Sequence, residues 1–296
     1  MNGAVSLSFD RRPSALPYMV RGMIPVTRRR ELAPRISAQW HQHRADPGEL
    51  ADFNRIAGLE PCDATLPLLY PHTFGFRLAM AVLTHPRFPV PIWGVLQTRN
   101  HLVQHRPIAV DQPLDFETTV MHGRVMPKGA EFDLRTTVHV GGALAWESMV
   151  TFFTRGRFGE PDPAPPLARA PTEAGQLVAE WTMSDADHWK FGSFTGDYNG
   201  IHMWDWYARR LGFRRALYHP SRVLGECLAR LPCATAATGH GESPRRLDVW
   251  LKGPVPHGAS VRLHAGLGAT ASTFALFAGD ERPSVVGRLE LLEATA

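Results

Sequence analysis

The sequence predicts an α+β protein built from two tandem units, and three observations lead to this class. A proline-rich segment at residues 160–166 divides the 296 residues near their midpoint, because proline is excluded from helix interiors and central strands. A block that begins at Tyr70 (Y-P-H-T-F-G) corresponds to one that begins at Tyr218 (Y-H-P-S-R-V-L-G). Strand-like segments follow both blocks. We therefore expect one unit in residues 1–165 and a second in residues 166–296.

Each repeated block opens an apolar segment that we predict to be a long buried helix. Apolar residues recur from Phe76 to Leu83 in the first half and from Val223 to Leu231 in the second. They cover so much of each helical wheel that a single apolar face cannot hold them all. A helix that is hydrophobic on most sides is buried rather than amphipathic.

Strand-like segments rich in β-branched and aromatic residues follow each helix and are separated by glycine, proline and aspartate. Short connections of this kind join neighbouring antiparallel strands. Each unit is therefore expected to be one long buried helix wrapped by an antiparallel sheet. The expected strands are 93–103, 114–125, 130–140 and 143–154 in the first unit, and 246–251, 260–266, 272–277 and 284–292 in the second.

The composition indicates a globular protein of a reducing, cytoplasmic compartment. The hydrophobic fraction of 44% and the charged fraction of 20% allow an ordinary core and exclude a disordered chain. Cys62, Cys227 and Cys233 are too few and too scattered for a disulfide framework or a zinc site. No run of 18 apolar residues predicts a membrane span, and the N-terminal residues lack the apolar stretch of a secretory signal.

The charge pattern does not predict a nucleic-acid partner. The net charge is +4, and acidic residues are interspersed among the basic ones without a finger motif or an aromatic–basic pattern. The histidines outside the segment described next lack a carboxylate or cysteine at ligand spacing, so we expect no metal. Gly266-x-Gly268 lacks the third glycine of a dinucleotide site. No cofactor is expected.

The segment from Ser184 to His202 carries the residues suited to chemistry. Ser184 and Asp187 have the spacing of a capping box, which predicts the start of a short helix. Gly196 is suited to the left-handed position that ends such a helix. Asn199 and the glycine after it form a strong turn dipeptide between Asp197 and His202. A tight turn there would bring the carboxylate and the imidazole together, where they can polarise a water molecule and transfer a proton.

Residues 191–202 read F-x-x-x-T-G-D-x-N-x-I-H, and this pattern resembles the signature of MaoC-like dehydratases. That family includes the (R)-specific enoyl-CoA hydratases, also called hydratase 2, and has the hotdog fold. The similarity is clear over about residues 187–231. The first half has no such signature, and two units with one signature resemble the double-hotdog members. In these, the degenerate half shapes the tunnel for the acyl chain.

The resemblance implies a hydro-lyase that adds water to a trans-2-enoyl thioester or dehydrates a 3-hydroxyacyl thioester. By position, Asp197 and His202 match the catalytic pair, and Asn199 matches the residue that orients their loop. The substrate would be a thioester of coenzyme A or of an acyl carrier protein, and arginines such as Arg214, Arg215 or Arg222 would contact its phosphates. The full set of expected substrate-binding residues is Asn199, Gly196, His219, Ser221 and Arg222.

One departure from the family leaves the function open. Where the family has a glycine whose N–H donates to the thioester oxygen, this chain has Pro220, which has no N–H. Loss of one such donor costs about 10²–10³ in rate. The N–H or the hydroxyl of Ser221, at the same helix end, could substitute. Two alternatives therefore stand beside the hydro-lyase: an acyl-CoA thioesterase on the same fold, and a non-catalytic module that binds acyl thioesters.

Two further expectations concern surfaces. Fused hotdog units can pair their sheets within one chain, and a homodimer is an open possibility. The tryptophans around the signature are expected to pack in the core or at its rim rather than to contact a ligand. They are Trp181, Trp189, Trp204 and Trp206.

Overall fold

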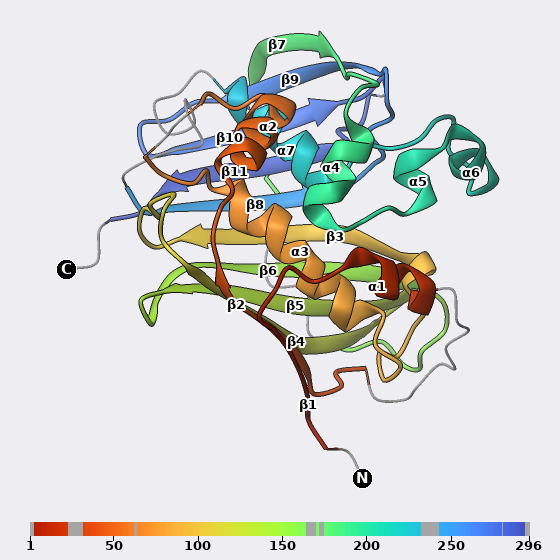
Figure 1. The fold of residues 1–296 in the computed structure, drawn as a ribbon. Coiled ribbons are helices and arrows are strands. Elements are labelled where there is room, and N and C mark those ends of the chain that lie inside the picture. Colours follow the sequence, from red (N-terminus) through yellow and green to blue (C-terminus); the bar gives the residue numbers. More distant parts are fainter. Residues whose placement is uncertain are drawn as a thin grey trace.

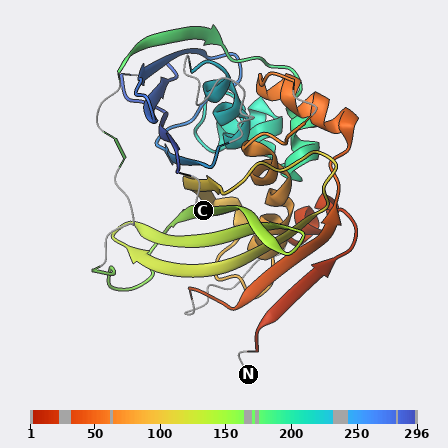
Figure 2. The same ribbon diagram turned by 90° about the vertical axis from the view of Figure 1, so that its left-hand side faces the viewer.

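A sheet of eleven strands curves around the helices in the computed structural model of the protein (Figure 1). The structure describes residues 3–22, 32–61, 64–163, 170–171, 175–231, 243–279 and 281–293. Within these residues the strand order is β1-β2-β4-β5-β6-β3-β8-β11-β10-β9-β7. Neighbouring strands are antiparallel except β1 and β2, which are parallel. Turning the molecule by 90° shows the strands wrapped around the helices (Figure 2).

The first half of the chain supplies six strands, of which four match the predicted ones closely. The predictions missed both N-terminal strands and the helices beside them. The burial of Ile36, Ala38 and Trp40 alternates with that of more exposed residues, which is the period of a strand with one buried face. The elements are β1 (Val5–Phe9), α1 (Ala15–Gly22), β2 (Ile36–His43), α2 (Pro47–Ala57), α3 (Leu69–Leu83), η1 (Ile92–Gly94), β3 (Val95–Gln104), β4 (Leu114–Met126), β5 (Gly129–Val140) and β6 (Ala143–Arg155).

The second half supplies five strands, and its four predicted strands match β8 to β11. The prediction missed β7. The expected boundary between residues 165 and 166 lies outside the described residues, as do Cys62 and Cys233; Cys227 is a buried free thiol. The elements are β7 (Gln176–Thr182), α4 (His188–Thr195), α5 (Gly200–Met203), α6 (Asp205–Arg210), α7 (Pro220–Ala229), β8 (Arg245–Leu251), β9 (Ser260–Gly266), β10 (Ala271–Phe277) and β11 (Val285–Leu291).

The two halves join edge to edge through β3 and β8. The antiparallel ladder pairs Leu102 with Leu247, and both side chains are fully buried on the helix side of the sheet. Across the same ladder His101 pairs with Asp248. Nδ1 of His101 lies 2.8 Å from Oδ1 of Asp248. Because the backbones of β3 and β8 are hydrogen-bonded to each other, neither strand is an exposed edge, and the two halves form one continuous sheet.

The two predicted buried helices lie at the centre of the fold. Every residue of α3 except Phe76 is buried, whereas α7 is shorter than expected and ends at Ala229. The helices cross between halves: α2 packs against α7, and α4 packs against α3 (Figure 1). At Gly225 an added Cβ would lie 2.7 Å from the Cβ of Ala57, so glycine permits the close approach of α2 to α7. No helix within the described residues is long and apolar enough to cross a membrane.

Buried histidines in the first half predict a loss of stability in mild acid. Burial lowers the pKa of His72 to about 4, and burial together with the charges of Arg12 and Arg77 lowers that of His43 to about 3. Between pH 6.5 and these values the unfolded chain binds protons that the folded chain does not, so stability falls as the pH falls. At pH 5 each histidine should cost about 2 kcal/mol relative to pH 7.

Urea unfolding of the wild type and of His72→Gln at pH 7 and pH 5 measures this cost. We expect the difference in unfolding free energy between the two pH values to be smaller in the variant by about 2 kcal/mol. An identical pH dependence in both proteins would contradict the assignment to His72.

Candidate active site

The loop between α4 and α5 begins as the sequence predicts. Gly196 ends α4 in the left-handed conformation, with φ of 73°, and its N–H donates to the carbonyl of Gly192. The N–H of Asp197 then donates to Oγ1 of Thr195 at 3.0 Å. These bonds turn the chain out of the helix at Asp197.

The predicted capping box at the start of α4 is wrong. Asp187 adopts a left-handed conformation with φ of 63° and makes no capping bond. Its Oδ2 instead accepts a hydrogen bond from Arg55 of α2 at 3.0 Å, and Oγ of Ser184 accepts from the N–H of Ala186. The Asp187 carboxylate therefore binds a residue of α2 and does not cap the main-chain N–H groups of α4.

Asn199 begins a helix where the sequence suggested only a turn. Its Oδ1 accepts a hydrogen bond from the N–H of Ile201, and α5 starts at Gly200. The Asn199 N–H in turn donates to Oδ1 of Asp197 at 3.0 Å. This single turn of helix carries His202 back over the loop. Asn199 thus holds both members of the expected pair.

Asp197 and His202 face each other in a partly open position. Their Oδ2 and Nε2 atoms lie 3.6 Å apart, and the side chains are 15% and 12% exposed, respectively. Nδ1 of His202 donates to the carbonyl of Leu217 at 2.9 Å. Because a carbonyl only accepts, this bond places the proton of the neutral imidazole on Nδ1 and leaves Nε2 free to accept. A water molecule within reach of both atoms would find two acceptors.

His219 contacts both members of this pair. Its ring stacks on that of His202, with centroids 4.1 Å apart, and its Nε2 donates to the main-chain carbonyl of Asp197 at 2.9 Å. The side chain is only 2% exposed. Burial, followed by the nearby His202, holds the pKa of His219 well below its ordinary value. His219 therefore stays neutral and positions the pair, and its contact with substrate stays a prediction.

The N-terminus of α7 lies directly after His219 and begins with Pro220 as its first residue. The N–H groups of Arg222 and Val223 both donate to the carbonyl of His219. Within the described residues the N–H of Ser221 donates to no main-chain carbonyl. Ser221 therefore offers the first free amide of the helix, as expected near a helix N-terminus.

Arg222 lies deeper than a phosphate contact requires. It is 3% exposed, its Nη1 donates to the carbonyl of Ala186 at 2.8 Å, and its guanidinium lies 4.4 Å from the ring centroid of Tyr218. These contacts tie the start of α7 to the segment before α4. Its proposed role at the substrate phosphates stays a prediction.

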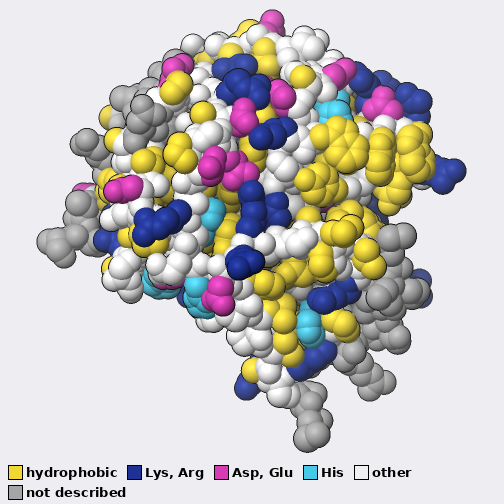
Figure 3. Space-filling view, in the orientation of Figure 1, with side chains coloured by type: hydrophobic (Ala, Val, Ile, Leu, Met, Phe, Trp, Pro, Cys, Tyr) yellow, Lys and Arg dark blue, Asp and Glu magenta, His cyan; other side chains and the backbone are white. Residues whose placement is uncertain are grey.

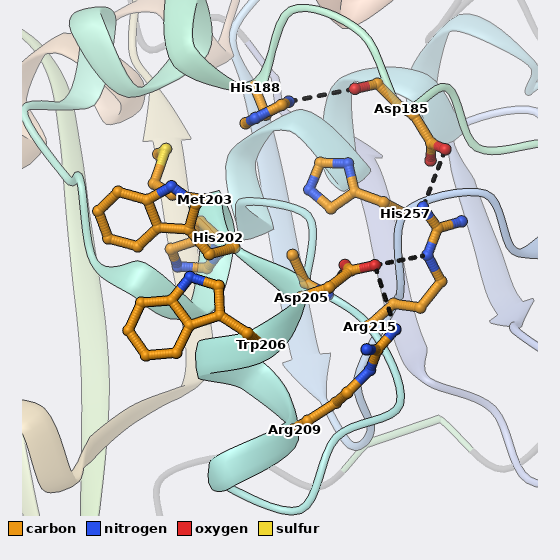
Figure 4. A pocket seen from close by; sticks show the side chains of 11 residues that line it. Asp185, His188, His202, Met203, Asp205, Trp206, Arg209, Arg215 and His257 are labelled. Atoms are coloured by element: carbon orange, nitrogen blue, oxygen red, sulfur yellow. Dashed lines mark hydrogen bonds and ion pairs between the residues drawn. The ribbon is translucent and has the colours of Figure 1, made fainter.

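A cavity of about 460 Å³ opens beside His202 (Figure 4). Asp205 lies on its wall, where the N–H of Ala216 and then the charge of Arg215 lower the pKa of its carboxyl. His257 also lines the cavity, and its Nε2 donates to the same Leu217 carbonyl as His202, at 3.2 Å. Figure 4 shows Trp206 and His202 on one side of the cavity and the paired charges on the other.

Three side chains in the site have the chemistry of metal ligands. Asp197, His202 and His219 place potential ligand atoms within 4.8 Å of one another, and no other such group of three occurs among the described residues. Each imidazole donates one N–H to a carbonyl and retains one nitrogen. His219, expected from the sequence as a substrate-binding residue, thus lies against the Asp197–His202 pair.

Sequence reasoning missed Arg77, which reaches the site from α3 of the first half. It is 7% exposed, and its guanidinium donates to the carbonyls of Phe194 at 3.2 Å, Pro13 at 2.6 Å and Ser193. Phe194 and Ser193 are in the last turn of α4, where carbonyls lack helical partners. Burial lowers the pKa of Arg77 to about 10. The available signal was that Arg77 is the one arginine, lysine, aspartate or glutamate in the apolar-rich helix of residues 69–83.

The chain is similar in sequence and in fold to known dehydratases. No protein-family model matches the chain. It is 30% identical over 234 residues to 3-hydroxyacyl-thioester dehydratase X of Mycobacterium tuberculosis, which covers 75% of this chain and 82% of that protein. A MaoC-like dehydratase from Phytophthora capsici superposes with a TM-score of 0.69 at 16% identity, covering 88% of this chain and 96% of that one. Rv0216 of M. tuberculosis, a double hotdog fold, has a TM-score of 0.50 at 16% identity, covering 98% and 94%.

Two central helices wrapped by one joined sheet form a double hotdog, and the Asp–His pair at the second helix is suited to hydration or dehydration. The chain belongs to the MaoC-like dehydratase family. The family and fold expected from the sequence are confirmed. The roles of the individual site residues stay predictions.

Arg77 is expected to matter for turnover although it does not line the cavity beside His202. Arg77→Gln removes the donors to the last turn of α4 and should let the Asp197 loop shift, lowering kcat by about 10–100-fold with KM changed less than threefold. Steady-state kinetics on a 2-enoyl thioester measures the split.

Arg55→Gln is the matched control, because Arg55 also contacts α4 but is 58% exposed. It should keep turnover within twofold of the wild type. Equal losses in the two variants, or a rise of KM alone in Arg77→Gln, would contradict a positioning role for Arg77.

Proposed function

We propose that the protein interconverts trans-2-enoyl thioesters and 3-hydroxyacyl thioesters by adding or removing water, with Asp197 and His202 as the catalytic pair. The observation that carries this proposal is the 3.6 Å approach of Asp197 Oδ2 to His202 Nε2, with His202 fixed by Leu217. The similarity to a 3-hydroxyacyl-thioester dehydratase supports the reaction class.

The geometry suits a single water molecule as the source of both added groups. A water held between Oδ2 and Nε2 would present its oxygen to C3 of the enoyl thioester while one of its protons passes to the pair. The C3–O bond forms as the C2=C3 double bond breaks, and the pair returns the proton to C2. In the reverse direction the pair removes the C2 proton and protonates the departing hydroxyl.

Negative charge develops on the thioester oxygen during this addition and needs a donor. Pro220 offers none, but the free N–H of Ser221 lies one residue further along the same helix start. The helix dipole adds to its effect. We therefore assign the donor to the Ser221 amide rather than to its hydroxyl.

The proposed reaction needs no metal or redox cofactor, because water, an acid–base pair and one donor complete it. The acyl group would be carried by coenzyme A or by a carrier protein. The cytoplasmic location expected from the cysteine content also belongs to this proposal.

Replacing Asp197 by asparagine tests the catalytic pair. With crotonyl-CoA and a medium-chain 2-enoyl-CoA, the wild type should reduce the enoyl absorbance, and Asp197→Asn should lower turnover by about 10²–10⁴ with an unchanged circular dichroism spectrum. Dialysis against a chelator should leave the wild-type rate unchanged.

Other outcomes point to the alternatives. Full activity of Asp197→Asn would remove this residue from the mechanism. Release of free thiol from a saturated acyl-CoA would indicate a thioesterase. Saturable acyl-CoA binding without turnover would indicate the non-catalytic binding module.

Ser221→Ala separates the two possible donors at the start of α7. Because alanine keeps the main-chain N–H, we expect kcat within about threefold of the wild type. A loss of about 10²–10³, the cost of one missing donor, would assign the role to the hydroxyl instead. The same absorbance assay measures both outcomes.

A further inference from the structure

Large apolar side chains are exposed together beside the active site. Trp189, Trp204, Trp206 and Leu211 are 48%, 42%, 53% and 49% exposed. Figure 3 shows hydrophobic side chains gathered over α5 and α6, with lysine or arginine at the edge of the cluster. Isolated exposed apolar residues are ordinary, but a contiguous group marks a surface that contacts something else.

The aromatic rings of this group support one another. The centroids of Trp189 and Trp204 lie 5.6 Å apart edge to face, and those of Trp204 and Trp206 lie 6.0 Å apart in a stacked arrangement. Rings held in this way lose little conformational freedom when a partner covers them. The cluster is thus already arranged for contact before anything binds.

Arginines without acidic partners flank the rings. The guanidinium of Arg210 lies 5.2 Å from the ring centroid of Trp206, and Arg214 is exposed after α6. Within the described residues neither forms an ion pair with a carboxylate, whereas Arg209 and Arg215 pair with Asp205. Uncompensated positive charge therefore adjoins the exposed rings. We call the whole group the aromatic–arginine surface: Trp189, Trp204, Trp206, Arg210, Leu211 and Arg214.

This surface begins at the mouth of the catalytic cavity and extends beyond it. Trp204 and Trp206 line the cavity that reaches His202, but Trp189, Leu211 and Arg214 do not. A ligand seated in the cavity would leave these outer side chains uncovered. A protein seated over the mouth of the cavity would cover both parts.

We propose that the aromatic–arginine surface docks an acidic carrier protein, which delivers the acyl thioester through the cavity on a phosphopantetheine arm. Carboxylates of the carrier meet Arg210 and Arg214, and its apolar side chains cover the tryptophans and Leu211. Complementary charge of this kind speeds association and selects the partner. The assignment rests on the proposed function, because it names the carrier of that substrate.

The test compares one acyl group on three carriers. Crotonyl thioesters of an acyl carrier protein, of coenzyme A and of N-acetylcysteamine are given to the wild type and to the double variant Arg210→Glu/Arg214→Glu. We expect kcat/KM for the carrier-protein substrate to fall at least tenfold, mainly through KM, and that for N-acetylcysteamine to stay within twofold. Arg157→Glu/Arg282→Glu is the matched control, since both arginines are exposed and make the same change in charge elsewhere. This control variant should leave kcat/KM for both substrates unchanged.

Binding of a fluorescently labelled acyl carrier protein, followed by anisotropy, tests docking separately from chemistry. Weaker binding by the Arg210/Arg214 variant than by the control supports the proposal even if no thioester is turned over. A lack of turnover would overturn only the proposed function.

Equal binding and equal kinetics in both double variants overturn the docking site. A loss confined to crotonyl-CoA would assign the surface to the nucleotide, and a changed oligomeric state in size-exclusion chromatography would assign it to a second copy of the chain; either overturns the proposal.

Discussion

The pairing of β3 with β8 determines the rest of this structure. Because it makes one sheet from two, α3 and α7 lie on the same face, and each is covered partly by a helix from the other half. The loop that bears Asp197 is part of the second half of the sequence. It nevertheless packs against the first half, because α4, which precedes the loop, contacts α3. The site is fixed by the same contacts that form the core.

Main-chain carbonyls organise the imidazoles of the site. The Leu217 carbonyl accepts from both His202 and His257, and the Asp197 carbonyl accepts from His219. Burial keeps the pKa of His257 at about 4, and that of His219 is also well below its ordinary value. These two rings stay uncharged, so neither of the histidines next to His202 carries a charge. Two neutral rings beside the pair position it without adding a charge of their own.

Local patterns explain how much the sequence could predict. Asp197, Asn199 and His202 lie within six consecutive residues, and their order fixes the Asx turn and the short helix that bring them together. The strands after each helix were found because their period and turns are local as well. The missed features depend on distant contacts. Asp187 has the spacing of a cap but pairs with Arg55, and nothing near Arg77 in the sequence indicates the end of α4.

The contacts of Arg77 also bear on how a duplicated chain evolves. The first half has no Asp–His signature, so chemistry alone would leave it free to diverge after duplication. Yet its central helix supplies the guanidinium that closes the last turn before Asp197. Selection on the proposed catalytic pair would thus extend to a half that lacks the Asp–His signature. Once such a dependence is established, truncation of the gene to the second half would remove the support of the Asp197 loop, and the duplication would become difficult to reverse.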